Sequence, residues 1–203
     1  MRDLDVRQAL YAKVLADHVR DPRTLVIPEL GIWSGGARVD IAVVNGRLHG
    51  FEIKSDTDTL KRLPAQREVY NSVFDRVTIV CGSRHTDHLS DQIPDWWGLK
   101  IATLGQRGAV HFEDVRQPKK NPCIDPVSLA GMLWRDEALR ILQQRGVKGI
   151  RSKRRLDLCK VLASHLEIDD LRDCVRAALK SRAGWRSDLQ STPRDDSLPL
   201  FSK

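Results

Sequence analysis

The stretch RVDIAVVNGRLHGFEIK, residues 38–54, predicts a β-hairpin, and the interpretation of the rest of the chain builds on it. Its first half alternates apolar residues with others, which is the period of a strand. Asn45-Gly46 is a strong signal for a tight turn between two strands. On the returning half the apolar residues alternate with Glu52 and Lys54. We therefore expect the charged side chains of both strands to gather on one face.

The apolar residues also predict the register of this hairpin. A two-residue turn would place Asp40 among apolar side chains. A loop of three residues, with Gly46 in a left-handed or bulged conformation, instead pairs Val44 with Leu48 and turns Asp40 toward Glu52. Because a slip of one residue turns every side chain to the opposite face, the apolar set selects this second register. The residues expected on the apolar face are Val39, Ile41, Val43, Phe51 and Ile53.

Two carboxylates that face each other across a sheet predict a cation between them. Like charges placed directly opposite destabilise a sheet. Mg²⁺ is usually held by one or two carboxylates together with water and phosphate. We therefore expect Asp40 and Glu52 to bind Mg²⁺ or Mn²⁺. The alternative is a surface pair that Arg38 and Lys54 neutralise without a metal.

Composition limits the class of protein. The chain has 203 residues, 41% of them hydrophobic, which is enough for one domain or for a compact domain with an appendage. It has no apolar run of membrane-spanning length, so we expect no membrane partner. The cysteines are scattered without a C-x-x-C pair, which argues against zinc and disulfides and is typical of a cytoplasmic protein. They are Cys81, Cys123, Cys159 and Cys174.

The chain divides into two regions and a tail. A polar stretch with three prolines, residues 117–126, separates mixed helix and strand patterns from purely helical ones. We predict a core domain at 1–117, a basic helical domain at 127–186 and a disordered tail at 187–203. Within the helical domain, the periodicity predicts helices at 129–144, 153–166 and 168–181.

Positive charge is concentrated in the second region. Residues 1–118 carry 16 Lys or Arg and 16 Asp or Glu, whereas residues 119–186 carry 16 Lys or Arg and 8 Asp or Glu. A basic region beside a neutral one predicts contact with a polyanion such as nucleic acid. The alternative is a solvated set of basic helices without a ligand.

The order of elements in the first region resembles the PD-(D/E)XK nuclease superfamily. A helix leads to three strands, of which the second carries an aspartate and the third a Glu-x-Lys. A further helix then bears Q-x-x-x-Y, the spacing of the RecB-like branch, and leads to an apolar strand. The residues that carry the resemblance are Glu29, Asp40, Glu52, Lys54, Gln66 and Tyr70. It covers about residues 3–115 and departs from the pattern at Val39, where a proline is usual.

This resemblance implies a fold. It implies an α/β restriction-endonuclease-like core, a central mixed sheet flanked by helices, to which this chain adds a small all-α C-terminal region. The whole chain is also similar to small bacterial and phage-borne proteins with such a core and a helical C-terminus. The resemblance also implies a phosphodiesterase that depends on Mg²⁺ or Mn²⁺, with DNA favoured over RNA as its substrate. Asp40, Glu52 and the Ile53 carbonyl would hold the metal, and Glu29 would be a further carboxylate.

Three more residues receive roles from the resemblance. Lys54 would orient the attacking water and offset the charge on the phosphate. Gln66 would position the phosphate or Lys54, and Tyr70 would support it from one helical turn away. Gln66 as a solvent-facing residue and Tyr70 as a core aromatic are the alternatives.

A basic cluster marks the helical domain. Five cations lie within eight positions near the start of a predicted helix: Lys148, Arg151, Lys153, Arg154 and Arg155. Cations there oppose the helix dipole, so the cluster predicts contact with backbone phosphates. The surrounding helix–turn–helix pattern faintly resembles SAP-like modules, although any helical hairpin has this form.

The sequence leaves the class of function open in several ways. Besides a nuclease acting in DNA repair, the same residues fit a defence or toxin effector that a partner restrains. They also fit a catalytically inactive module of the same fold that binds nucleic acid or a protein partner. A homodimer is compatible with each of these.

Overall fold

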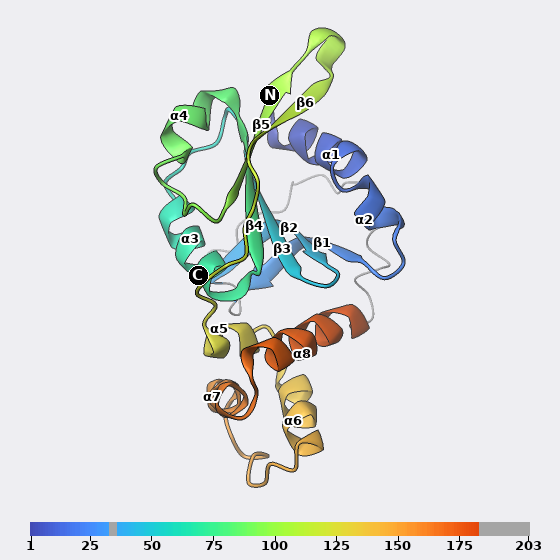
Figure 1. Cartoon of the computed structure of the whole chain (residues 1–203), viewed down its shortest axis with the longest axis vertical. Helices are drawn as coiled ribbons and strands as arrows, with labels where there is room; N and C mark the ends of the chain where they lie inside the picture. The colour runs from blue at the N-terminus through green and yellow to red at the C-terminus, as the bar shows by residue number, and fades with distance from the viewer. Residues whose placement is uncertain (33–35, 183–203) are drawn as a thin grey trace, which may run out of the picture.

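The structure, a computed structural model, describes residues 1–32 and 36–182. The chain forms an α/β fold, in which a six-stranded mixed sheet is flanked by helices and a further helical region lies beyond one end of the sheet (Figure 1). The β5–β6 hairpin projects at the opposite end (Figure 1). The predicted disordered tail, 187–203, falls outside the described residues.

The six strands follow chain order across the sheet. They are β1 Leu25–Ile32, β2 Ala37–Val44, β3 Leu48–Lys54, β4 Arg76–Gly82, β5 Gly98–Leu104 and β6 Val110–Arg116. The pairs β1–β2, β2–β3 and β5–β6 are antiparallel, whereas β3–β4 and β4–β5 are parallel. Parallel neighbours require a crossover connection, and helix α3 lies within the one between β3 and β4.

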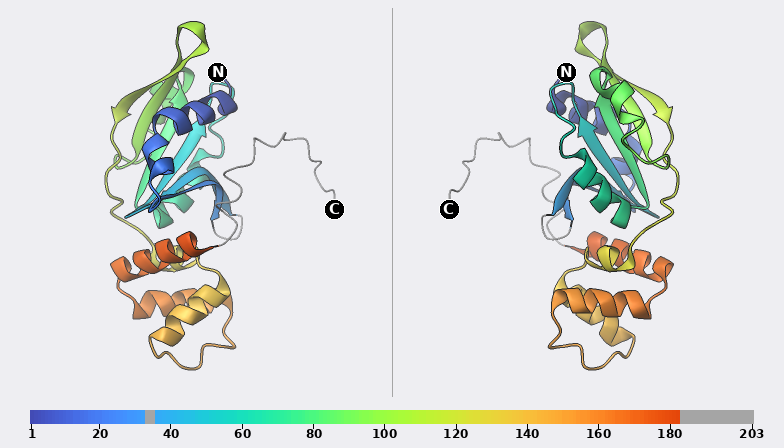
Figure 2. Two further views of the ribbon diagram at one scale, coloured as in Figure 1. Left: turned by 90° about the vertical axis from the view of Figure 1, so that its right-hand side faces the viewer. Right: turned by 90° about the vertical axis from the view of Figure 1, so that its left-hand side faces the viewer.

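Helices cover both faces of the sheet. One face packs against α1 Asp3–Lys13 and α2 Ala16–Arg20, and the other against α3 Leu63–Val73 and α4 Thr86–Leu89, as Figures 1 and 2 show. Two short 3₁₀ turns, η2 Ser83–His85 and η3 Gln106–Gly108, complete this part. Pro64 occupies the first turn of α3, where a proline costs a helix least.

The predicted register of the central hairpin is confirmed. Val44 pairs with Leu48, so the loop has three residues. Asn45 closes it, since its backbone N–H donates to the Arg47 carbonyl and its side-chain oxygen accepts from the Arg47 N–H, both at 3.1 Å. The left-handed conformation expected as one option for Gly46 is wrong, because the φ angle of Gly46 is not positive.

The expectation of a single apolar face on this hairpin is wrong for one residue. Ile41, Val43, Phe51 and Ile53 pack together on the α1 side, as predicted, whereas Val39 packs on the α3 side. The physical reason is that helices bury both faces of the sheet, so apolar residues are favourable on either one. The β1–β2 pairing is also interrupted between Val39 and Ile41, where the strand can turn its side chains over.

The C-terminal region contains four helices within the residues that the structure describes. They are α5 Pro126–Ala130, α6 Arg135–Gln144, α7 Arg155–His165 and α8 Ile168–Ser181. Their buried side chains belong to the same apolar cluster as the α3 side of the sheet. A separate domain therefore stays a prediction, and one apolar cluster continues from this face of the sheet into the helical region.

The helix predicted at 129–144 is two helices. The Asp125 carboxylate caps the first by accepting from the Ser128 N–H at 2.7 Å. The second starts after Trp134, whose N–H donates to Glu137 at 2.7 Å. Within residues 1–32 and 36–182, no helix is long and apolar enough to cross a bilayer. The four cysteines are free.

Candidate functional site

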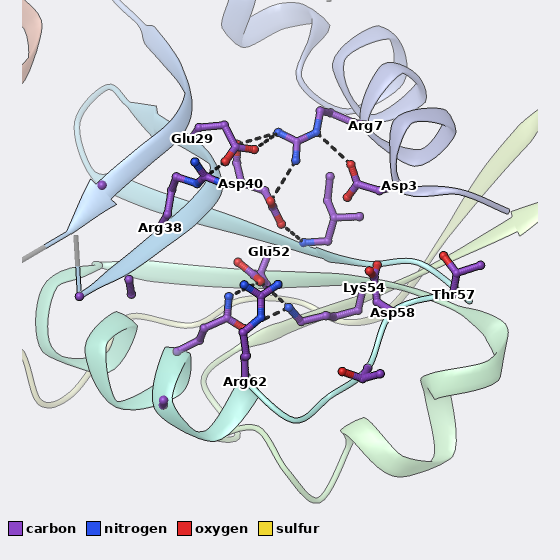
Figure 3. Close-up of a pocket in the computed structure, with 17 residues that line it drawn as sticks. Asp3, Arg7, Glu29, Arg38, Asp40, Glu52, Lys54, Thr57, Asp58 and Arg62 are labelled. Atoms are coloured by element: carbon purple, nitrogen blue, oxygen red, sulfur yellow. Dashed lines mark hydrogen bonds and ion pairs between the residues drawn. The ribbon is translucent and has the colours of Figure 1, made fainter. Parts of the chain in front are cut away.

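A polar cavity of about 900 Å³ opens beside β2 and β3. Its walls come from α1, the first three strands, the loop after β3 and the start of α3 (Figure 3). The ionisable residues that line it are Asp3, Arg7, Glu29, Arg38, Asp40, Glu52, Lys54, Asp58 and Arg62. Five carboxylates and four cations therefore share this space.

Glu52 is the most enclosed carboxylate of the cavity. It is 2% exposed, and Lys54 beside it is 4% exposed. The Lys54 ammonium donates to Glu52 Oε1 at 2.6 Å and to Gln66 Oε1 at 3.0 Å. The Gln66 amide donates to the same Glu52 oxygen at 2.6 Å. Strand β3 and helix α3 thus join in one buried network, because residues two apart on a strand share a face.

Tyr70 completes this network from one turn further along α3. Its hydroxyl lies 2.7 Å from Glu52 Oε2 and 2.8 Å from the Arg38 carbonyl, so its single proton bonds one or the other. The ring is fully buried among Phe74 and Trp97. Tyr70 is therefore both a core aromatic and a hydrogen-bonding member of the site.

Asp40 holds the place where the β2–β3 ladder stops. The last paired residues are Ile41 and Phe51, and the backbone N–H of Ile53 donates instead to the Asp40 carboxylate at 2.7 Å. The other carboxylate oxygen accepts from the Arg7 guanidinium at 3.0 Å. The side chain of Asp40 thus substitutes for a backbone partner and fastens α1 to the sheet.

Glu29 lies at the rim of the same cavity. Its carboxylate pairs with Arg7 at 2.7 Å and with Arg38 at 2.5 Å (Figure 3). Its backbone has φ 53°, in the left-handed region that residues with a side chain seldom adopt. The predicted position of Glu29 beside Asp40 is observed, because both residues contact Arg7.

Burial shifts the ionisation of this cluster. Desolvation raises the pKa of Asp40, against the opposing effects of the Ile53 N–H and Arg7. Desolvation also raises the pKa of Glu52, and the nearby Asp40 charge adds to that shift. Burial alone would lower the pKa of Arg7, but the charge of Asp40 and its acidic neighbours raise it above its ordinary value. Burial therefore raises the pKa of both carboxyl groups, and the cations beside them oppose that shift.

The structure does not require a metal to explain these carboxylates. Both oxygens of Asp40 and Oε1 of Glu52 accept hydrogen bonds from protein donors, and the Tyr70 hydroxyl lies 2.7 Å from Glu52 Oε2. Across the described part of the chain, no group of three or more His, Cys, Asp or Glu side chains could hold a metal ion. The predicted metal-binding centre is therefore not seen, and the neutralised pair fits the arrangement, with Arg7 as a partner besides Lys54.

The predicted basic cluster lies on the loop between α6 and α7. Gly146 and Gly149 take positive φ angles of 74° and 69° there and bend the chain back on itself. Lys148, Arg151 and Arg154 are exposed and Lys153 is partly exposed. Among the described residues, the side chains of these four have no hydrogen-bond or ion-pair partner.

Arg155 differs from its neighbours in the cluster. Its guanidinium donates to the backbone carbonyls of Leu133 at 3.3 Å and Gly131 at 2.6 Å. These carbonyls follow α5, so Arg155 joins α7 to the connection between α5 and α6. It is held within the protein, and the cations open to a ligand are the other four.

A shallow hollow of about 470 Å³ lies beside these cations. Its lining includes Lys148, Arg151 and Ser152. The N-terminus of α7 follows, and Arg154 at its N-cap makes no capping side-chain hydrogen bond. The first N–H groups of α7 therefore have no capping acceptor, as at any uncapped helix start.

The sequence did not reveal two residues that matter for the acidic cavity. Arg7 contacts Asp3, Glu29 and Asp40 from α1. The only signal in the sequence is the four-residue spacing of Asp3 and Arg7, which is a helical ion pair by itself. Arg62 at the start of α3 also lines the cavity. Contacts between the first helix and a strand more than 30 residues away leave no local pattern.

Comparison with known proteins places the chain outside the predicted superfamily. The model of the family described as "Bacteriophage P4 protein cII" matches residues 4–194. A curated relative, "Protein cII" of Enterobacteria phage P4, is 30% identical over 182 residues, which cover 90% of this chain and 68% of the relative. No solved structure matches the chain significantly.

These findings correct the expectations that the resemblance gave. The assignment to the PD-(D/E)XK superfamily is wrong, since the match over nearly the whole chain is to another family. The predictions of a nuclease, of a metal-dependent hydrolase and of a role in DNA repair or phage defence rested on that assignment and are wrong as well. The motif residues lie together as expected, but an arrangement of side chains does not by itself establish a reaction.

Proposed function

We propose that this chain, which belongs to the bacteriophage P4 protein cII family, binds the phosphate backbone of DNA through the loop between α6 and α7. The observation that carries the proposal is the group of four cations at the uncapped start of α7 that have no partner among the residues the structure describes. They are Lys148, Arg151, Lys153 and Arg154. We call these four residues the basic loop.

A free protein gains nothing from cations in this position. The N-terminus of a helix carries a partial positive charge, and neighbouring cations raise the energy of the helix. An anion reverses the sign of both effects, because helix N–H groups and lysine or arginine side chains all favour a phosphate. The arrangement costs stability in the free protein and supports binding of a polyanion.

The surrounding charge supports the same proposal. Residues 119–186 carry eight more Lys and Arg than Asp and Glu, which attracts a polyanion over a distance. The basic loop lies at the far end of the helical region from the sheet (Figure 2). A duplex can reach it there without contacting the acidic cavity. Binding of this kind is governed by the DNA backbone and not by base sequence.

Salt dependence provides a sharp test. We expect a triple variant, K148Q/R151Q/R154Q, to bind duplex DNA more weakly in fluorescence anisotropy. The log–log slope of affinity against salt should fall by about 0.9 for each DNA phosphate that the variant no longer neutralises. Arg107→Gln is the matched control, because Arg107 is exposed on the distant β5–β6 turn.

The outcomes separate clearly. If the triple variant binds DNA with unchanged affinity and unchanged salt slope, the basic loop does not touch the backbone and the proposal is wrong. Because the triple variant removes three charges and the control removes one, a reduction in Arg107→Gln of about a third of that in the triple variant would show that only net charge matters. Arg155 is kept in both variants, because its removal would disturb the helices.

The predicted Mg²⁺ or Mn²⁺ at Asp40 and Glu52 stays a prediction. Two carboxylates and water suffice for Mg²⁺ in other proteins, but here the ion must displace Arg7 or Lys54 from them. Titration calorimetry of wild type and Asp40→Asn decides it, since a specific ion gives heat in wild type alone. Cytoplasmic location and the finer restriction-endonuclease-like description of the sheet also stay predictions, and neither carries the function.

A further inference from the structure

A second hollow, of about 320 Å³, lies where the sheet meets the helical region. The β2–β3 loop, the start of β4, the stretch before α5 and helix α8 form its walls. Five cations and three carboxylates line it. The cations are Arg47, Arg76, Lys120, Arg172 and Arg176. It lies apart from both the acidic cavity and the basic loop, with which it shares no lining residue.

The carboxylates of this hollow are already occupied. Asp75 accepts from the Leu48 N–H at 2.7 Å and pairs with Arg172 at 3.0 Å and Arg176 at 3.5 Å. The other two carboxylates, Asp169 and Asp173, pair with the same two arginines one helical turn away. Three negative charges are thus bound to two positive ones.

Three cations of the hollow are left without a carboxylate in the part of the chain that the structure describes: Arg47, Arg76 and Lys120. Among the described residues, none of these three side chains has a hydrogen-bond or ion-pair partner. Burial lowers the pKa of Arg76, and the nearby positive charge of Arg47 lowers it further. Arg47 and Arg76 therefore repel each other, and although the charge of Asp75 partly offsets this shift, no carboxylate of the described residues forms an ion pair with either arginine.

Arg172 adds a second sign of incomplete pairing. Its Nε is buried and makes no hydrogen bond, although it lies 3.0 Å from Asp75. The Asp75 carboxylate thus neutralises the charge of Arg172 but does not accept a hydrogen bond from its Nε. The space holds about ten water-sized volumes, which is ample for a phosphate or a diphosphate.

We propose that this hollow binds a phosphate group, with Arg47, Arg76 and Lys120 as its principal ligands. Arginine suits this role because its planar fork binds phosphate oxygens in pairs. The group belongs either to a free phosphorylated compound or to the backbone of a nucleic acid, and both offer the same oxygens. The proposal goes beyond the DNA binding of the basic loop, because it concerns another face and does not require DNA.

A phosphate held there would link parts of the chain that are far apart in sequence. Arg47 belongs to the β2–β3 loop, Arg76 to β4 and Lys120 to the stretch before α5. An anion between them removes their repulsion in the native state alone. A ligand that binds only the native state raises the unfolding temperature as its concentration rises. The bound phosphate is therefore expected to stabilise the packing between the sheet and the helical region.

Inorganic diphosphate is the first probe, with wild type, Arg76→Gln, Lys120→Gln and the control Arg107→Gln. We expect wild type to bind diphosphate in titration calorimetry and to gain thermal stability over sodium chloride at equal ionic strength. Removal of one charged hydrogen bond should weaken binding roughly tenfold or more in Arg76→Gln and Lys120→Gln. Arg107→Gln should bind like wild type. Circular dichroism confirms that each variant is folded, and Lys120→Gln changes an exposed residue only.

Duplex DNA is the second probe and identifies the source of the phosphate. If Arg76→Gln and Lys120→Gln also reduce the salt slope for DNA, the group is a backbone phosphate. If DNA binding is unchanged while diphosphate binding disappears, it is a free phosphorylated compound. No diphosphate binding at millimolar concentration, or an equal reduction in Arg107→Gln, would overturn the proposal. The DNA role of the basic loop fails separately, through K148Q/R151Q/R154Q.

Discussion

Arg7 of α1 holds Asp40 of β2 at two points. One guanidinium nitrogen donates to the carboxylate at 3.0 Å and the other donates to the backbone carbonyl at 3.2 Å. The opposite carboxylate oxygen accepts from the Ile53 N–H, where the ladder between β2 and β3 has ended. This single aspartate therefore joins a helix and two strands.

Asp40→Ala should destabilise the protein by about 1–3 kcal/mol, the usual cost of a buried donor left without its acceptor. The Ile53 N–H and the Arg7 guanidinium are both deprived of a partner in this variant. Asp40→Asn keeps one acceptor oxygen and should cost less. Urea unfolding of both variants measures the difference. Equal destabilisation by alanine and asparagine would show that the carboxylate is not needed as an acceptor.

Lys54→Met should be more damaging, because it leaves Glu52 buried without its cation. Breaking a buried ion pair from one side commonly costs about 3–5 kcal/mol. The double variant E52Q/K54M removes both charges and should be destabilised by less than the sum of the single changes. Lys61→Met, at an exposed position, is the control. Additive changes in unfolding free energy would contradict a direct coupling between Glu52 and Lys54.

His49 makes stability depend on acid. It stacks on Phe51 and lies 2.9 Å from the Thr78 hydroxyl, and burial lowers its pKa to about 3, with Arg76 and Arg47 adding to the shift. Between that value and the ordinary histidine pKa of about 6.5, the His49 side chain is protonated in the unfolded chain and neutral in the native protein.

The stability that depends on neutral His49 is complete above its ordinary pKa of about 6.5 and disappears as the pH falls toward 3. The slope is at most about 1.4 kcal/mol for each pH unit. Urea unfolding between pH 7 and pH 4 should show a smaller slope in His49→Gln than in wild type. An identical slope in the two proteins would mean that the pKa of His49 is the same in the folded and the unfolded state.

Two neighbouring arginines should behave differently. Arg155→Gln should lower the unfolding temperature, since its guanidinium donates to the carbonyls of Leu133 and Gly131. Arg154→Gln should leave the temperature nearly unchanged and weaken DNA binding instead. Differential scanning fluorimetry and fluorescence anisotropy on both variants measure the two effects. Reversed results would exchange the structural and DNA-binding assignments.

Local patterns were sufficient to predict the hairpin and its register. The turn signal at Asn45-Gly46 and the alternation on both strands specify the pairing of Val44 with Leu48 without reference to the rest of the chain. The face that Val39 occupies could not be predicted in the same way. It depends on helices that bury both sides of the sheet, and those helices are distant in sequence.

The candidate site was predicted in its positions and not in its function. Glu52, Lys54, Gln66 and Tyr70 form one hydrogen-bonded network, as the spacing on β3 and α3 required. Arg7 entered only with the packing of α1 against the sheet. The spacing of a carboxylate and a lysine describes where charges meet. It is compatible with a closed ion-pair network as well as with a reaction, and this is why the nuclease interpretation failed.

The left-handed backbone of Glu29 also affects how readily the edge of the sheet can pair with a strand of another molecule. β1 is one edge of the sheet, and a straight edge strand offers its free backbone groups to any passing strand. Pro28 lacks an N–H, and the turn of the chain at Glu29 breaks the regular row of donors and acceptors. The ion pairs of Glu29 with Arg7 and Arg38 hold that irregular segment in place. The feature that shapes the rim of the cavity therefore also makes this edge of the sheet a poorer template for pairing with another strand.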